Sequence, residues 1–241
     1  MSDFIKTAQA EQAFEMCQTV LKARPYSKIG QITGDPGTGK STLTNWLADE
    51  FEGVRVECWM DMGDKALLEE IAMGLNARGA SLDVSGTAPT LFRKIKGECA
   101  GKLIIIDEAN QLKWATLEKL RGLSDIGGAG LILAGTDILA KRLIEARVRV
   151  YLAQLRQRIG AKKVLMKPIT DDAELAAYVI APRFGQVTKG TAKRFRIITQ
   201  GQWRSALELA DACERLMTNE GLTKIDERVV ETAAAWMAGR S

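Results

Sequence analysis

The chain contains no histidine, and its four cysteines are scattered. The absence of histidine excludes imidazole as a general base and also excludes His-ligated metal sites. Cys17, Cys58, Cys99 and Cys213 form no C-x-x-C pair, so the common zinc and redox spacings are missing. Acid–base chemistry must therefore use carboxylates, lysine or tyrosine, and we expect the cysteines to be reduced core thiols of a cytosolic protein.

Long apolar runs are also missing. No stretch of about 18 apolar residues occurs, which predicts no transmembrane helix and no membrane partner. The segment Met1 to Lys6 lacks the basic-then-apolar order of a signal peptide. We therefore expect a cytoplasmic protein. Its 241 residues, 46% of them hydrophobic, suffice for one large domain or two small ones with a substantial core.

Positive charge is concentrated in one part of the chain. The formal net charge is +4, but residues 141–204 hold fifteen Lys or Arg and only four Asp or Glu, so the remainder is net negative. Basic stretches attract polyanions, of which nucleic acid is the commonest large one. A solvated helix face, with arginines directed at a neighbouring subunit's nucleotide, explains the same charges, and the sequence leaves both interpretations open.

The most specific motif is a glycine-rich loop of the form G-x-x-x-x-G-K-[ST]. Its glycines permit backbone angles closed to other residues, so successive N–H groups can surround phosphate oxygens. Lys40 would supply positive charge to the β- and γ-phosphates, and the Ser41 hydroxyl would ligate Mg²⁺. The predicted ATP-binding residues are Gly34, Asp35, Pro36, Gly37, Thr38, Gly39, Lys40, Ser41 and Thr42.

The surroundings of this loop favour a nucleotide site over a plain structural turn. The partly β-branched segment before it suits a strand. Leu43, Trp46 and Leu47 after it have helical spacing. Strand, glycine loop and helix is the order that phosphate binding requires.

Strand and helix patterns alternate up to Pro168, which predicts an α/β domain with a parallel sheet. Only helical patterns follow, which predicts a small C-terminal helical lid. The expected strands are 29–33, 54–59, 103–106, 130–134 and 163–166. The expected helices are 3–23, one from the loop to about 51, 64–77, 91–99, 112–122, a long one from 136 to about 159, 171–181, 188–198, 203–219 and 225–238.

The predicted parts are an N-terminal helix (1–25), the α/β domain (26–168) and the lid (169–241).

A pair of carboxylates follows the most apolar predicted strand. Such a strand is covered on both faces and suits a sheet centre. Asp107, at its end, would hold Mg²⁺ directly or through water. Glu108 would orient and polarise the attacking water as the catalytic base. Two acids at a strand end are common by chance, but they are much less so downstream of a phosphate loop.

With both motifs in place, the chain resembles the AAA+ ATPases from about residue 26 onward. The resemblance implies a P-loop three-layer domain with a central parallel sheet and a small C-terminal helical lid. Thr136, after strand 130–134, resembles the sensor 1 residue, although it could also be a plain helix cap. Arg158, or else Arg156, would be the arginine finger that reaches a neighbour's nucleotide. Arg204 resembles sensor 2 on a lid helix and would contact the bound nucleotide.

Within that class the chain is similar to the transposition ATPases of the phage Mu B, TniB and TnsC kind. The segments that carry the similarity are Ala134–Thr136, Tyr151–Ile159 and Lys167–Thr170. The last two are shared with ExeA-like secretion ATPases, which normally carry a membrane segment and a periplasmic domain that this sequence lacks. Mu B has an N-terminal DNA-binding domain, for which the roughly 25 residues before the first strand are too few.

This resemblance implies an ATP- and Mg²⁺-dependent, sequence-nonspecific DNA-binding ATPase in a bacterial or phage-infected cell. Subunits would form a helical filament on duplex DNA and deliver that DNA to a transposase, and ATP hydrolysis would dismantle the filament. DNA contacts would be made to phosphates and weakened by salt. The candidate contacts are Lys65, Lys94, Lys96 and Lys113, with Arg93 beside them. Each is also explained as an exposed basic side chain on a helix face.

The sequence is also consistent with two other functions. The chain could be a helicase loader of the IstB/DnaC kind or a secretion ATPase, acting on a protein partner. It could also be a nucleotide-switched protein with little turnover. Glu108 argues against the switch, because a pure switch can dispense with a catalytic base.

Overall fold

The computed structural model describes residues 4–145 and 150–239. The chain forms two compact units. The first comprises Met1–Asp35 and Lys40–Met166, and the second comprises Pro36–Gly39 and Lys167–Ser241.

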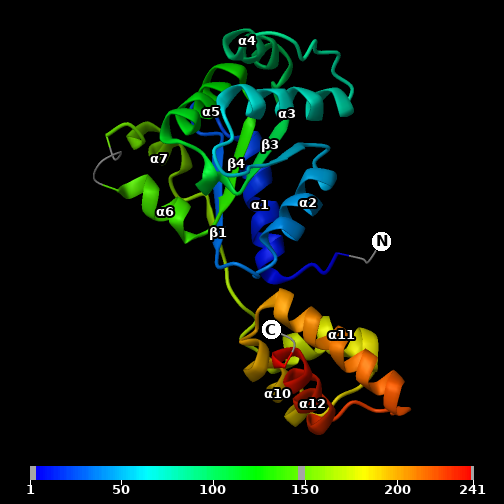
Figure 1. The fold of residues 1–241 in the computed structure, drawn as a ribbon. Helices are drawn as coiled ribbons and strands as arrows, with labels where there is room; N and C mark the ends of the chain where they lie inside the picture. The colour runs from blue at the N-terminus through cyan, green and yellow to red at the C-terminus, as the bar shows by residue number, and fades with distance from the viewer. Residues whose placement is uncertain (1–3, 146–149, 240–241) are drawn as a thin grey trace. The chain divides into compact units, whose positions relative to one another are not determined.

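The first unit is built on a five-stranded sheet whose paired strands all run parallel (Figure 1). The strand order is β2-β3-β4-β1-β5. The strands are β1 (Ile29–Gly34), β2 (Val54–Glu57), β3 (Leu103–Asp107), β4 (Gly130–Gly135) and β5 (Lys163–Met166). β3 and β4 are buried at every residue, which confirms the expectation that the apolar run 103–106 lies inside the sheet.

Helices cover both faces of this sheet and make three layers. On one face Ile104 and Ile106 pack with α3, α4 and α5, and on the other Ile105 and Ile132 pack with α1 and α2. Successive strand residues point to opposite faces, so each face has its own core. The helical elements are α1 (Ala8–Lys22), α2 (Lys40–Glu50), α3 (Asp64–Ala77), α4 (Ala88–Glu98), the 3₁₀ turn η1 (Ala109–Gln111), α5 (Trp114–Gly127), α6 (Asp137–Ile144) and α7 (Ala153–Ile159).

The long helix predicted from 136 to about 159 is wrong. α6 ends at Ile144, where Glu145 leaves the helical region at φ −59° and ψ 132°. α7 begins at Ala153, and residues 146–149 lie outside the described part. The spacing of apolar residues does not reveal a break of this kind. A helix is defined by local backbone hydrogen bonds, which can stop while the apolar spacing continues.

The N-terminal helix also begins later than residue 3. α1 starts at Ala8, where the side chain of Thr7 accepts a hydrogen bond from the backbone N–H of Ala10. A threonine oxygen satisfies a backbone donor at a helix start in this way, so Thr7 fixes the first residue of the helix.

The second unit is helical around a core of its own, as the sequence predicts. Its elements are α8 (Asp172–Leu175), the π-helical turn η2 (Ala176–Ile180), α9 (Ala181–Phe184), α10 (Lys189–Thr199), α11 (Trp203–Glu220) and α12 (Glu227–Ala238). The π-helical turn lies just before Pro182, which cannot donate a backbone hydrogen bond and so disturbs the predicted helix 171–181. In the described residues, none of the helices has the length and apolar character needed to cross a membrane.

All four cysteines are free and buried, as expected for core thiols. Burial raises the pKa of Cys17, Cys58 and Cys213 to about 12, and that of Cys99 to about 11. For Cys58, the negative charges of Asp107 and Glu108 add to the effect of burial. The thiols are therefore protonated at neutral pH and weakly nucleophilic.

Candidate functional site

Three strand ends meet at one edge of the sheet. The glycine loop follows β1, Asp107 ends β3, and Thr136 follows β4. β3, β4 and β1 are neighbours in the sheet and run parallel, so their carboxyl ends share this edge. In open α/β sheets ligands bind outside the carboxyl ends of the strands. The topology thus brings together residues that lie about 100 positions apart in the sequence.

The glycine loop has the backbone that phosphate binding requires. Gly37 and Gly39 adopt φ of +83° and +86°, a region that favours glycine. Lys40 is the first residue of α2, is only 6% exposed, and its Nζ donates to the carbonyl oxygen of Asp35 at 2.8 Å. Ser41 is exposed in the first turn of the same helix. The loop therefore offers a lysine and a hydroxyl at the start of a helix, whose positive end favours anions.

Asp107 is fully buried, and both of its carboxylate oxygens accept hydrogen bonds. Its Oδ1 accepts the backbone N–H of Glu108 at 2.9 Å. Its Oδ2 accepts the hydroxyl of Thr44 at 3.0 Å and Nη2 of Arg55 at 2.7 Å. A buried carboxylate is tolerated in a protein interior only when it is paired and hydrogen-bonded in this way.

Arg55 and Thr44 are site residues that sequence reasoning missed. Arg55 also donates from Nε to the Thr44 hydroxyl at 3.0 Å and from Nη2 to Glu57 at 3.0 Å. Val54 and Val56, its neighbours on β2, are buried in the core, so alternation points Arg55 to the opposite face. A charged residue between buried valines was the available signal, but its partner depends on the pairing of β2 with β3.

Glu108 and Thr136 are joined through Asn110. The Asn110 amide nitrogen donates to Oε2 of Glu108 at 3.3 Å, and its amide oxygen accepts the backbone N–H of Thr136 at 3.0 Å. Arg142 fixes this turn by donating to the carbonyl oxygens of Asn110 and Leu112 at 2.8 and 2.7 Å. Glu108 itself adopts left-handed angles, φ 51° and ψ 36°, which turn its side chain out of the strand direction.

The residues at this edge fit a magnesium nucleotide. The hydroxyl oxygen of Thr136 is buried and has no hydrogen-bond partner among the described residues. Buried polar atoms are normally hydrogen-bonded, so this hydroxyl is available to a ligand. A hydroxyl and a carboxylate, from Ser41 and Asp107, are ligands that Mg²⁺ prefers. These two would hold the metal, and Lys40 with the loop amides would hold the phosphates.

The two candidate finger arginines lie on α7 in different environments. Arg158 donates to both carboxylate oxygens of Asp125, at 3.1 and 3.3 Å, and its guanidinium lies 5.2 Å from the ring centroid of Tyr26. Asp125 is almost completely buried and is also bonded by Arg121. Arg156 is half-buried, and its guanidinium forms no hydrogen bond or ion pair with another described residue. Of the two, Arg156 has the uncommitted guanidinium.

Arg204 lies in the second unit, in the first turn of α11. Its side chain is exposed, and its backbone N–H donates to the carbonyl oxygen of Gly37 at 3.3 Å. Its role as a nucleotide contact stays a prediction.

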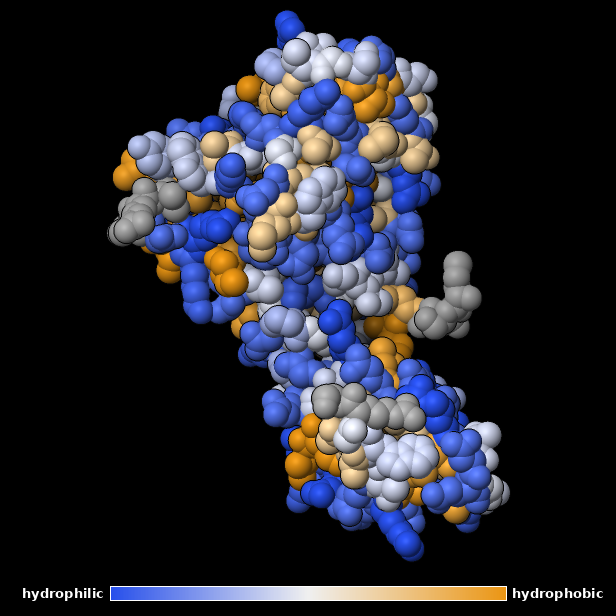
Figure 2. Space-filling view, in the orientation of Figure 1, coloured by the Kyte–Doolittle hydropathy of each residue, from blue (hydrophilic) through white to orange (hydrophobic). Residues whose placement is uncertain are grey.

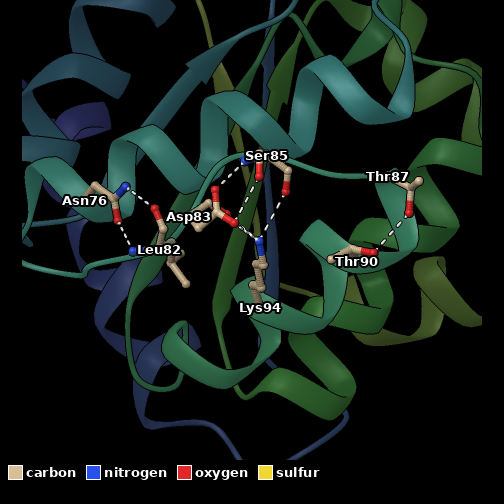
Figure 3. A network of polar contacts seen from close by, with 7 residues as sticks. All are labelled: Asn76, Leu82, Asp83, Ser85, Thr87, Thr90 and Lys94. Atoms are coloured by element: carbon tan, nitrogen blue, oxygen red, sulfur yellow. Dashed lines mark hydrogen bonds and ion pairs between the residues drawn. The ribbon is translucent and has the colours of Figure 1, made fainter.

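Lys94 has a structural task that the sequence did not reveal. Its ammonium donates to Oδ2 of Asp83 at 2.7 Å, to the Asp83 carbonyl at 2.9 Å and to the Ser85 carbonyl at 3.1 Å (Figure 3). Together with the amide of Asn76, which bonds both backbone groups of Leu82, it holds the loop between α3 and α4. We therefore leave Lys94 out of the proposed DNA contacts.

The other candidate basic side chains are exposed. Lys65 pairs with Glu69 on α3 at 3.4 Å, and Lys113 precedes the first turn of α5. These two helix starts lie together, because Asp64 accepts hydrogen bonds from Thr116 and Lys119. Arg93 and Lys96 are exposed on α4.

Comparisons with known proteins agree with this geometry. An AAA domain family matches residues 24–143. The chain is 30% identical over 146 residues to the Mu-like prophage FluMu DNA transposition protein B of Haemophilus influenzae, covering 58% of this chain and 48% of that protein. It is 26% identical over 180 residues to the ATP-dependent target DNA activator B of Escherichia phage Mu, covering 72% and 55%. The chain thus spans about half the length of these transposition relatives.

The fold is similar to that of solved structures. Cdc6p from Pyrobaculum aerophilum superposes with a TM-score of 0.72 at 15% identity, covering 97% of this chain and 69% of that one. At this identity the likeness concerns the fold alone.

Proposed function

Because the chain belongs to the AAA+ ATPases of the Mu B transposition family, we propose that it hydrolyses ATP to control its own assembly on DNA. ATP-bound subunits form a helical filament on duplex DNA without sequence preference. The filament delivers this DNA to a transposase and activates it, in the cytoplasm of a bacterium or a phage-infected cell. Hydrolysis dismantles the filament.

The observation that carries the proposal is the meeting of five side chains at one sheet edge. Lys40 neutralises phosphate charge, and Glu108 polarises the attacking water as general base. The unsatisfied hydroxyl of Thr136 is available to the γ-phosphate or to that water. Ser41 and Asp107 would hold Mg²⁺, which would supply positive charge to stabilise the transferring phosphoryl group. No histidine is needed for this chemistry.

Assembly is supported by the arginines of α7 and by apolar side chains around α6. Arg156, or Arg158 after release from Asp125, completes a neighbour's site by binding phosphate oxygens bidentately. Ile138 and Ile144 on α6 are 53% and 62% exposed, and Figure 2 shows apolar side chains on the surface around α6. Exposed apolar patches of this kind are typical of protein–protein contact sites.

DNA binding is supported by the basic side chains at two helix starts and by the names of the relatives. Lys65 and Lys113 lie on neighbouring segments, with Lys96 on α4 as a further candidate. Contacts of lysine to phosphates position DNA without reading its sequence. The phage Mu relative is named a target DNA activator, which supports a transposase as the recipient.

The test compares ATP hydrolysis with and without duplex DNA, and images the protein with a non-hydrolysable ATP analogue. We expect stimulation by DNA, which falls as salt rises, and nucleotide-dependent filaments. Monomers with DNA-independent turnover would overturn the proposal. Co-purification with a replicative helicase, without stimulation of a transposase, would instead favour a loader.

A further inference from the structure

Arg55 is a cation built into the proposed metal site. Its Nη2 lies 2.7 Å from Oδ2 of Asp107, the carboxylate that would hold Mg²⁺. Its Nε lies 3.0 Å from the hydroxyl of Thr44, which itself donates to the same Oδ2. Two side chains, one from β2 and one from α2, therefore bond the same carboxylate oxygen on β3.

This arrangement neutralises a charge that the fold would otherwise leave buried. Asp107 has no exposed surface, and the Arg55 side chain is only 15% exposed. A buried carboxylate without a counter-charge is strongly unfavourable, so a cation must accompany it whether or not a metal is present. Arg55 fills this need in the absence of Mg²⁺.

The guanidinium of Arg55 bonds two carboxylates. The same Nη2 that bonds Asp107 also bonds Glu57, which is exposed, at 3.0 Å. Glu57 lies two residues further along β2 and is paired in register with Asp107. The exposed glutamate thus draws part of the guanidinium's charge away from the buried aspartate, so the two acids have opposite effects on how firmly Arg55 is held at Asp107.

We propose that Arg55 competes with Mg²⁺ for Asp107 and so sets the Mg²⁺ concentration at which nucleotide binds. The inference rests on the proposed nucleotide site. Two positive charges near one carboxylate repel each other, so the resident cation weakens the binding of the second. Glu57 moderates this effect by sharing the guanidinium.

The experiment measures binding of a fluorescent ATP analogue to the full chain over a series of Mg²⁺ concentrations. Arg55→Gln keeps a hydrogen-bond donor but removes the charge, and we expect its Mg²⁺ midpoint to fall by about threefold or more. Glu57→Gln leaves Arg55 wholly to Asp107, and we expect its midpoint to rise by about twofold. Arg55→Lys keeps the charge and should leave the midpoint near that of the wild type.

A matched control removes an arginine from the same region that does not touch Asp107. Arg78 bonds the carbonyl of Gly53 and the carboxylate of Asp49, so Arg78→Gln should not move the midpoint. Opposite shifts in Arg55→Gln and Glu57→Gln support competition when the rise in Glu57→Gln disappears in the double variant, because the lost charge of Glu57 alone would raise the midpoint there too. If Arg55→Gln does not fold, Glu57→Asp decides, because it keeps the negative charge but shortens the side chain that bonds Arg55: a raised midpoint supports competition, and an unchanged midpoint overturns it.

The outcomes separate the inference from the proposed function. Equal midpoints in wild type and Glu57→Gln, or a higher midpoint in Arg55→Gln, would overturn the competition while leaving the nucleotide site intact. A wild-type protein that binds no nucleotide at any Mg²⁺ concentration would overturn both.

Discussion

The side-chain oxygen of Asn110 accepts the backbone N–H of Thr136 at 3.0 Å, although the two residues follow different strands. The same amide donates to Glu108 at 3.3 Å. Asn110 therefore links the proposed catalytic base to the strand end that carries the unsatisfied threonine hydroxyl. A change in the position of either group is transmitted to the other through one rigid amide.

Removing this link should slow hydrolysis more than it weakens nucleotide binding. In Asn110→Ala the side chain of Glu108 loses its donor and the N–H of Thr136 loses its acceptor. We expect a loss of about 1–3 kcal/mol in the free energy of unfolding, because polar groups are left unpaired. The turnover number should fall about tenfold or more, because the base is no longer oriented. Single-turnover kinetics and equilibrium nucleotide binding measure the two effects separately.

Asn76→Ala is the matched control for Asn110→Ala. Its amide also bonds backbone groups, both at Leu82, but in the loop between α3 and α4 (Figure 3). It should lose stability by a similar amount and keep its turnover number. If both variants lose turnover equally, the effect of Asn110 is only structural.

Glu108→Gln should bind ATP but hydrolyse it about 10²- to 10⁴-fold more slowly, which is the usual contribution of a general base. Nucleotide titration and phosphate release measure the two properties, and we expect assemblies to persist in this variant. Lys40→Ala is the contrasting variant, because loss of the loop's positive charge should abolish binding itself. Equal turnover in wild type and Glu108→Gln would show that Glu108 is not the base.

Replacing each of the two α7 arginines should have a different effect on the free energy of unfolding. Arg158→Ala should lower the free energy of unfolding by about 1–3 kcal/mol, since Arg158 pairs with the buried carboxylate of Asp125. Arg156→Ala should change stability by less than about 0.5 kcal/mol, because no such partner is lost. Denaturant unfolding measures both changes.

The finger itself is identified by cooperativity. Without the arginine finger, the protein should keep its nucleotide binding and its stability. Its hydrolysis should no longer depend on protein concentration. We expect this of Arg156→Ala. Retained cooperative hydrolysis in Arg156→Ala, with its loss in a stably folded Arg158→Ala, would assign the finger to Arg158.

Gly135→Ala should be destabilising at the end of β4. A Cβ atom at this position would collide with the amide oxygen of Asn110, which is held in place by Thr136 and cannot yield freely. We expect a cost of about 1–3 kcal/mol in thermal or denaturant unfolding, as for other overpacked sites.

Gly97→Ala, in α4, gives the opposite expectation. A Cβ atom there meets no atom within 4 Å, and the residue is helical. Replacement should stabilise by about 0.5–1 kcal/mol. If the two variants have the same stability, the close approach of Asn110 to β4 is not rigid.

The strands and the loop were predictable because their signals are local. The buried run 103–106 marks the centre of the sheet, and the motif residues around Lys40 and Asp107 stand in a fixed order along the chain. Parallel strands then bring these residues to one edge whatever the details of packing.

Arg55, Thr44 and Asn110 were not predictable in the same way. Their partners are set by the register of β2 on β3 and by the turn after β3, which the sequence does not specify. The break after Ile144 was missed for a related reason, since apolar spacing continues across a change of backbone direction. Local pattern thus locates the ligand-binding edge, and tertiary pairing determines which charges surround it.

The left-handed backbone of Glu108 has a consequence for variants selected by stability alone. A non-glycine residue in this conformation costs about 1–2 kcal/mol, which glycine would recover. Selection for heat resistance would therefore enrich Glu108→Gly and discard the proposed base. Maintaining a glutamate here requires selection for turnover, so this position distinguishes a lineage that hydrolyses ATP from one that only needs to fold.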